Sequence, residues 1–161
     1  MLIDTHCHYN HERLENEIEA CLLRAEADDV KQCIVVGFNR DSSEAAVKLA
    51  ERYPKQVYAA VGVHPHDSKH WNTDTEEWFR QISLHPAVVA IGEIGLDFHY
   101  DFSPRPDQYA AFRSQMRLAK EVSLPVILHC REAYPETLAI LAEPEFAEVR
   151  GVMHCWAGSV E

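Results

Sequence analysis

The sequence lacks three features that would by themselves assign it to a class of protein. No apolar run approaches the roughly 20 residues that a membrane-spanning helix needs. No basic and apolar leader opens the chain, so secretion is not indicated. The five cysteines are odd in number and contain no C-x-x-C pair, which favours a reducing compartment. We therefore expect a cytoplasmic protein without a membrane segment.

Positive charge is also scarce, because 15 lysines and arginines face 26 aspartates and glutamates and leave a net charge of −11. A protein that holds nucleic acid by neutralising phosphates alone is expected to be basic, so the composition argues against that class. A phosphate-bearing substrate would have to meet bound cations or a few local arginines instead. The 161 residues, 47% of them hydrophobic, suffice for one domain with a sizeable core.

Short apolar runs alternate with longer amphipathic segments along the whole chain. We predict strands at residues 1–8, 32–38, 57–64, 87–97, 124–130 and 151–158. Helices are expected at residues 14–29, 41–53, 73–85, 107–123 and 136–143. The second helix would take Asp41 or Ser42 as its N-cap, and the third a threonine or aspartate. This alternation, with strands apolar on both faces, predicts a parallel sheet covered by helices.

The number of these units points to an unfinished barrel. A closed barrel of eight units typically needs about 250 residues. The predicted fold class is therefore α/β, a (β/α)8 TIM-barrel type truncated after about six strands. We expect one barrel domain over residues 1–161, incomplete at its C-terminus. Two open sheet edges would favour aggregation, so we expect either a second chain that completes the barrel or a remnant of a longer enzyme.

Polar side chains gather where the predicted strands end. Side chains alternate across a strand with period two, so His6 and His8 share one face while Cys7 points to the other. The same alternation separates His129 from Cys130. Active sites of parallel α/β folds lie at the carboxyl ends of the strands. The polar residues expected at that rim are His6, His8, His64, Glu93, His129 and His154.

The residue types at this rim favour metal binding. Neutral imidazoles and a carboxylate are good ligands for Zn²⁺ or Mn²⁺, and a carboxylate can bridge two ions. A single histidine at a strand end is more often a hydrogen-bonded structural residue. Glu93, inside the apolar stretch VVAIGEIGL, is harder to explain without a cation, because a buried unpaired charge is costly. The joint placement of these residues predicts a metal centre.

Five stretches carry a resemblance to a known family. They are IDTHCH, GVHPH, GEIGLDF, LPVILHCREA and GVMHCWAGS, in this order across essentially all 161 residues. With them the chain resembles the N-terminal part of the TatD-type metal-dependent hydrolases, which belong to the amidohydrolase-like barrels and are described as deoxyribonucleases. The resemblance implies a hydrolase that cleaves phosphodiester bonds at DNA ends with a metal-activated water.

The resemblance also implies two divalent ions, which would be Mg, Mn or Zn. His6 and His8 would hold one ion, His129 and His154 the other, and Glu93 would bridge the pair and serve catalysis. The last ligand of the family is an aspartate near the end of strand eight, and that part of the family pattern is absent from this sequence. The ion at His6 and His8 would then be one ligand short.

Further residues are candidates for contacts with the substrate. The resemblance implies that His64 of GVHPH donates to a phosphate oxygen or shuttles a proton. His66 in the same motif would bind the substrate. Arg131 shares the face of His129, and its guanidinium suits either phosphate or a salt bridge with a helix carboxylate. The aromatic residues near the rim could stack on the bases of a single strand or pack under a loop: Phe98, Tyr100 and Trp156.

Two other functions stay open at this point. One is a hydrolase of amide or carboxylic-ester bonds, because the same kind of site activates water for either reaction. No lysine stands at the ends of strands four to six, however, and bridging carbamylated lysines are frequent in the amide-hydrolysing relatives. The other is an inactive, truncated family member that binds at most one ion. His99 also departs from the family, in which an aromatic residue is commoner at that place.

Overall fold

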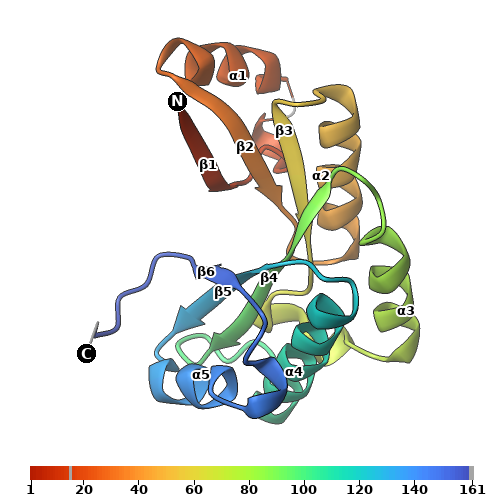
Figure 1. Cartoon of the computed structure of the whole chain (residues 1–161), viewed down its shortest axis with the longest axis vertical. Helices are drawn as coiled ribbons and strands as arrows, with labels where there is room; N and C mark the ends of the chain where they lie inside the picture. Colours follow the sequence, from red (N-terminus) through yellow and green to blue (C-terminus); the bar gives the residue numbers. More distant parts are fainter. Residues whose placement is uncertain (15, 160–161) are drawn as a thin grey trace.

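The computed structural model describes residues 1–14 and 16–159, which form one curved sheet with helices along its outer side (Figure 1). The strands are β1 (Leu2–Cys7), β2 (Val30–Val36), β3 (Val57–Val61), β4 (Val88–Asp97), β5 (Val126–Arg131) and β6 (Gly151–Met153). The helices are α1 (Ile18–Ala27), α2 (Arg40–Arg52), α3 (Thr73–Ile82), α4 (Arg105–Glu121) and α5 (Tyr134–Leu141). Short 3-10 helices lie at η1 (Glu12–Leu14), η2 (Pro65–His70) and η3 (Pro144–Phe146).

The six described strands are all parallel and stand in sequence order from β1 to β6, which confirms the predicted truncated barrel. A parallel pair needs a crossover, and in each unit the helix carries the chain back across the outer face. The main core lies between this face and the helices, around residues such as Val35, Ile91 and Phe112. A smaller apolar cluster on the other face consists of Val36, Ala60, Ala90 and Ile127.

The sheet is open at both ends of this order, because within the described residues β1 and β6 each pair with one neighbour only. Leu2 and Ile3 of β1 and Val152 of β6 are exposed, and β1 and β6 lie on the side of the sheet away from α2 and α3 (Figure 1). The longest helix, α4, has 17 residues. Among the described residues, no helix combines the length and the hydropathy that crossing a membrane would require.

The two predicted N-caps are wrong. In α2 the cap is Asn39, whose side chain accepts the Ser42 backbone N–H at 3.0 Å, while the Ser42 hydroxyl accepts the Asn39 N–H at 2.9 Å. In α3 the cap is Asn72, whose side chain accepts the Thr75 N–H at 3.0 Å. Asparagine caps a helix as well as serine or aspartate does, so in both places the polar run that follows forms the first turn instead.

Other helix bounds also differ from the predicted ones. α4 and α5 begin two residues earlier, because Pro106 and Pro135 lie in their first turns, where a missing N–H costs nothing. α1 begins only at Ile18, and the residues expected to open it include Leu14, which ends η1.

Two strands end before the residues expected to close them. β3 ends at Val61, and His64 is the N-cap of η2, whose first residue is Pro65. Proline cannot donate to a strand ladder. β6 ends at Met153 rather than at residue 158, since the chain turns directly afterwards and Cys155 has a φ of 45°. His64 and His154 are therefore loop residues.

β4 ends at Asp97, as the predicted bounds of 87–97 have it, so Glu93, which was expected at the rim, lies before the end of its strand. Residues 94–97 pair with residues 128–131 of β5, which keeps the strand extended. The register between β4 and β5 shifts between Ile91 and Ile94, and such an irregularity re-aims side chains locally. The Glu93 N–H donates to the carbonyl of Gly37 at 2.8 Å instead of joining the ladder to β5. Glu93 thus reaches the inner face from the middle of a buried strand.

We expect Asn39→Ala to lower the free energy of unfolding by about 1 kcal/mol, because the Ser42 backbone N–H in the first turn of α2 loses its acceptor. Urea denaturation followed by circular dichroism measures this loss. Asp41→Ala is the matched control, since Asp41 is an exposed residue of the same turn. A larger loss in Asp41→Ala than in Asn39→Ala would contradict the assignment of the cap.

Candidate metal centre

Two histidines from the start of the chain meet the glutamate of β4. His6 Nε2 lies 3.2 Å from His8 Nε2 and 3.4 Å from Glu93 Oε2. His6 belongs to β1 and His8 follows its last residue, so both rings lie on the inner face of the sheet. Each residue offers a ligand atom within 4.8 Å of the other two. We name His6, His8 and Glu93 the first ligand group.

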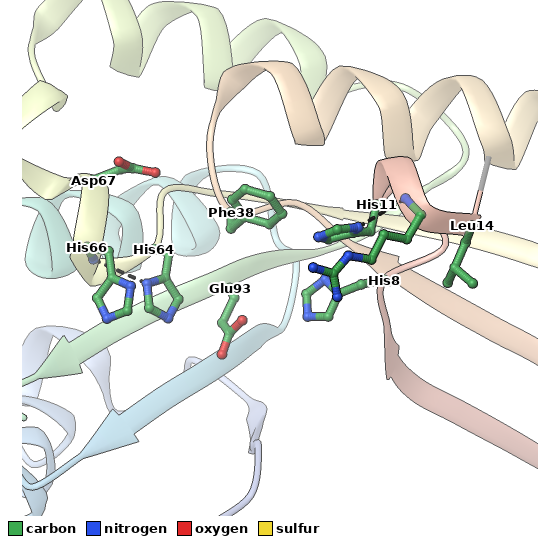
Figure 2. Close-up of a pocket in the computed structure, with 9 residues that line it drawn as sticks. His8, His11, Leu14, Phe38, His64, His66, Asp67 and Glu93 are labelled. Atoms are coloured by element: carbon green, nitrogen blue, oxygen red, sulfur yellow. Dashed lines mark hydrogen bonds between the residues drawn. The ribbon is translucent and has the colours of Figure 1, made fainter. Parts of the chain in front are cut away.

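A second ligand group consists of His64, Glu93 and His129, whose ligand atoms also lie within 4.8 Å of one another. His129 Nδ1 lies 3.0 Å from Glu93 Oε1. The ring centroids of His64 and His129 are 4.3 Å apart. Figure 2 shows His64 on one side of Glu93 and His8 on the other. Glu93 is therefore common to both groups and turns one oxygen to each.

His154 was expected to share an ion with His129, and the structure places it differently. Its ring stacks on the ring of His6, with 3.5 Å between the centroids and 12° between the planes. Within the part of the chain that is described, the third member of the second ligand group is His64. His154, which follows the last residue of the short strand β6, thus lies against the first ligand group.

The donor set of the first ligand group fits a divalent cation. Imidazole nitrogens and a carboxylate oxygen are the ligands that Zn²⁺ and Mn²⁺ take in proteins. The facing Nε2 atoms of His6 and His8 can share only one hydrogen bond, whereas a cation would bind both lone pairs. Their Nδ1 atoms are buried and have no hydrogen-bond partner among the described residues.

Glu93 remains a carboxylate although it is only 5% exposed. Burial raises its pKa, but hydrogen bonds from His129 and His6 and the nearby His64 lower it by more, so the pKa of Glu93 lies well below its usual range. A permanent negative charge therefore stands between the two ligand groups. This is the electrostatic condition for holding a cation there.

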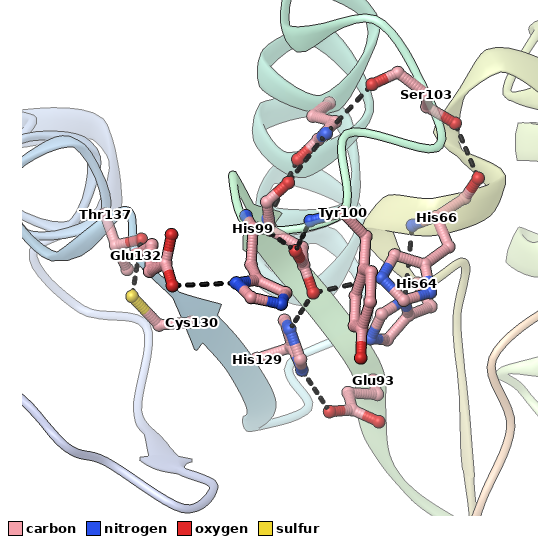
Figure 3. Close-up of polar contacts among 12 residues, drawn as sticks. His64, His66, Glu93, His99, Tyr100, Ser103, His129, Cys130, Glu132 and Thr137 are labelled. Carbon is pink, nitrogen blue, oxygen red and sulfur yellow. Dashed lines mark hydrogen bonds and ion pairs between the residues drawn. The ribbon is translucent and has the colours of Figure 1, made fainter.

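Asp97 completes the site, and the sequence analysis did not identify it. It is fully buried, and its Oδ2 accepts hydrogen bonds from His129 Nε2 and His66 Nε2, both at 3.0 Å. Figure 3 shows the contact between Glu93 and His129, and the other nitrogen of the same ring contacts Asp97. Period-two spacing from Glu93 places position 97 on the same face of β4, so a signal was available in GEIGLD.

The surroundings of His129 and His64 shift the pKa values of the two rings in opposite directions. Burial lowers the pKa of His129, but its hydrogen bonds with Glu93 and Asp97 and their charges outweigh burial and raise the pKa above its usual value. Burial, aided by the nearby His129, lowers the pKa of His64 to about 3. His64 is thus neutral at pH 7. Its Nδ1 accepts the His66 backbone N–H at 3.2 Å, which leaves Nε2 as the nitrogen that carries the proton.

A cavity of about 680 Å³ opens beside both ligand groups (Figure 2). His66, a predicted substrate contact, lines it together with His8, His64 and Glu93. Five wall residues were not identified from the sequence: His11, Arg13, Leu14, Phe38 and Asp67. They come from η1 and the loop before it, from η2 and from the loop after β2, and no local pattern marks them because only the fold brings them together. The volume is in the range of small-ligand sites.

Arg131, the other predicted substrate contact, does not line this cavity. Its guanidinium lies 4.8 Å from the centroid of the Tyr100 ring. No carboxylate reaches ion-pair distance of Arg131 among the described residues, so the alternative of a salt bridge with a helix is not seen.

Two cysteines point away from the ligand groups, as the strand alternation predicts. The Cys7 thiol donates to the carbonyl of Ile34 at 3.4 Å. Cys130 is buried, and its sulfur accepts the Thr137 hydroxyl of α5 at 3.3 Å. The histidines beside them face the opposite side of the sheet.

Comparison with known proteins decides the family. The family model described as TatD related DNase matches residues 3–161. The chain belongs to the TatD-related DNase family. Family membership also agrees with the metal-dependent chemistry that the two ligand groups suit.

Relatives of this TatD-family chain are longer than the chain itself. An uncharacterized metal-dependent hydrolase of Bacillus subtilis, YabD, is 44% identical over 161 residues, which are 100% of this chain and 63% of that protein. A 3′-5′ ssDNA/RNA exonuclease TatD of a Rahnella species is 42% identical over 84% of this chain and 52% of that protein. The crystal structure of the TatD homologue YJJV of Escherichia coli matches with a TM-score of 0.87 and 34% identity, over 98% of this chain and 61% of that one.

The lowered pKa of His64 makes stability depend on pH. An unfolded histidine titrates near 6.5, whereas folded His64 stays neutral down to about 3. Between these values the unfolded chain binds the extra proton, so this contribution is present above pH 6.5 and is lost as the pH falls. We expect His64→Gln to flatten the fall in unfolding free energy between about pH 6.5 and 4.

Urea denaturation in EDTA at a series of pH values measures this slope. His70→Gln is the matched control, because His70 is an exposed histidine of the same 3-10 helix. If the slope of His64→Gln equals that of the parent chain, the neutral state assigned to His64 is wrong.

Asp97→Asn should lower the affinity of the TatD-family chain for Mn²⁺ or Zn²⁺ by about 10- to 100-fold, because the carboxylate orients His129 from behind. Isothermal titration calorimetry with the metal alone measures this affinity. Asp101→Asn is the control, since Asp101 is exposed and pairs with Arg105. An unchanged metal affinity in a folded Asp97→Asn chain would show that Asp97 does not position His129.

Proposed function

We propose that the chain is the metal-ligand half of a divalent-metal-dependent phosphodiesterase that acts on the ends of single-stranded DNA. The observation that carries this proposal is the buried carboxylate of Glu93, which faces His6 with one oxygen and His129 with the other. Membership in the TatD-related DNase family supports the reaction class. The ssDNA/RNA exonuclease activity named for the Rahnella relative supports the substrate.

We further propose two ions per site, of Mg, Mn or Zn. The first ligand group would hold one ion, and Glu93 with His129 would hold the other, because both ring nitrogens of His64 are already occupied. The His154 ring lies stacked on His6 of the first ligand group. Such a pair supplies a water of lowered pKa and offsets the charge of the phosphate. Glu93 would contribute the negative charge that both ligand groups share.

The neighbouring side chains have distinct proposed roles. His64 is neutral and carries its proton on Nε2, so it donates to a phosphate oxygen or passes a proton on. His66 is held by Asp97 at 3.0 Å and lines the cavity, where it contacts the substrate. Arg131 lies outside the cavity wall and contacts a neighbouring phosphate of the strand.

An amide hydrolase is the weaker alternative. β4, β5 and β6 contain no lysine to bridge two ions, and the anion between the ligand groups is Glu93. We propose that further strands cover the edges of β1 and β6 in the active enzyme, since the parts of these relatives that the chain matches are 52–63% of their length. The five free thiols agree with a cytoplasmic location.

Glu93→Gln should remove metal and activity together, because an amide leaves both ligand groups without their shared anion. We expect hydrolysis of bis(p-nitrophenyl) phosphate by the metal-loaded chain to fall about 100-fold or more. Elemental mass spectrometry of the same samples reports metal per chain.

Cys130→Ser is the matched control, because Cys130 lies on the opposite face of β5 from His129. It should keep the metal content of the parent. Full activity in a Glu93→Gln chain would refute the proposed function, and metal loss in Cys130→Ser would show that the strand faces are assigned incorrectly.

A further inference from the structure

Two aromatic rings lie exposed on the loop between β4 and α4. Tyr100 is 46% exposed and Phe102 is 57% exposed. Their rings stack, with 5.1 Å between the centroids and 18° between the planes. Large aromatic side chains usually bury their surface, so a stacked pair in solvent needs an explanation other than core packing.

This pair stands at the edge of the candidate metal centre. The centroid of the His66 ring lies 4.8 Å from that of Phe102 and 5.5 Å from that of Tyr100. Figure 3 shows Tyr100 beside His64 and His66, with its ring extending towards Glu93. A strand that places one phosphate at Glu93 would therefore carry its next bases over these rings.

A cation accompanies the pair. The Arg131 guanidinium lies 4.8 Å from the Tyr100 centroid, and Arg131 is exposed. The acidic side chains on the two loops are already engaged, Glu132 with His99 at 2.8 Å and Asp101 with Arg105 at 2.9 Å. Arg131 thus keeps its charge available for an anion, in a chain whose net charge is −11.

The loop that carries the rings is held in place. Asp97 Oδ1 accepts the backbone N–H of Tyr100 at 3.0 Å. Ser103 is fully buried, its hydroxyl donates to the His66 carbonyl at 2.7 Å, and it accepts the Lys69 N–H at 3.1 Å. Lys69 Nζ in turn donates to the Phe102 carbonyl at 3.2 Å. The rings are therefore pre-positioned, which lowers the entropic cost of binding.

We propose that Tyr100, Phe102 and Arg131 form a stacking platform for the unpaired bases of single-stranded DNA that enters the metal centre. The rings would stack on successive bases and Arg131 would pair with a phosphate, the combination that binds single strands without sequence preference. The inference rests on the proposed function. The other two rim aromatics take no part, since Phe98 packs on Tyr109 and Trp156 on Tyr134.

The test is the binding of a fluorescein-labelled dT oligonucleotide of about 12 residues to the metal-loaded full chain, measured by fluorescence anisotropy, with phosphorothioate linkages that slow hydrolysis. We expect Tyr100→Ala and Phe102→Leu to weaken binding about five-fold or more, because leucine keeps apolar volume but offers no ring face. Phe102→Trp, which keeps an aromatic face, should bind with the affinity of the parent chain. Leu84→Ala is the control, since Leu84 is an exposed apolar residue on another surface.

Arg131→Ala should weaken binding and reduce the slope of log Kd against log salt by about 0.7, the value for one lost phosphate contact on a single strand. Arg24→Ala removes an equal charge from the surface of α1 and should leave the slope unchanged. A duplex of the same length should bind about ten-fold more weakly or worse, because its bases are already stacked.

The platform would be overturned if Tyr100→Ala and Phe102→Leu both bound the oligonucleotide as tightly as the parent chain. It would also be overturned if the parent chain bound the duplex as tightly as the single strand, or bound neither. Hydrolysis of bis(p-nitrophenyl) phosphate by the metal-loaded parent tests the proposed function separately, because that substrate carries no base. Binding through the rings without hydrolysis would leave the platform standing and overturn the proposed function. Hydrolysis without ring-dependent binding would do the reverse.

Discussion

The site depends on one physical constraint, the placement of a negative charge at Glu93 within the buried middle of a strand. A carboxylate in that position is costly unless cationic or hydrogen-bonding groups surround it. Here histidines on both sides supply those contacts, and the irregular register between β4 and β5 turns the side chain to the inner face. Every other feature of the centre follows from how the chain surrounds this charge.

The histidines around Glu93 differ in pKa because their environments differ. Asp97 and Glu93 hold the two nitrogens of His129 from opposite sides and raise its pKa. Burial keeps His64 neutral next to it. One imidazole is thus an oriented partner of two anions, and the other is a proton donor whose tautomer is set by the backbone N–H of His66.

The acidic surface limits the ways in which the chain could hold the proposed nucleic-acid substrate. Most arginines of the helices are tied to carboxylates, as Arg80, Arg113 and Arg117 show. Little positive charge remains for a general attraction of phosphate, so affinity for the proposed substrate would have to come from bound ions and from the few free cations near the rim. Arg131 lies beside exposed aromatic rings, so these local contacts could bind the strand although the net charge of the chain is negative.

The sequence by itself determined the order of strands and helices, the face on which His6, His8 and Glu93 lie, and the family, because period-two alternation and short motifs are local properties of the chain. It misplaced the N-caps of α2 and α3, since several residue types cap equally well. Only the tertiary structure put His64 beside His129, stacked His154 on His6, added Asp97 as the anchor of two histidines, and exposed Phe102 next to Tyr100. These contacts join loops that are distant in the sequence, and their geometry is set by how the strands pack rather than by any local pattern.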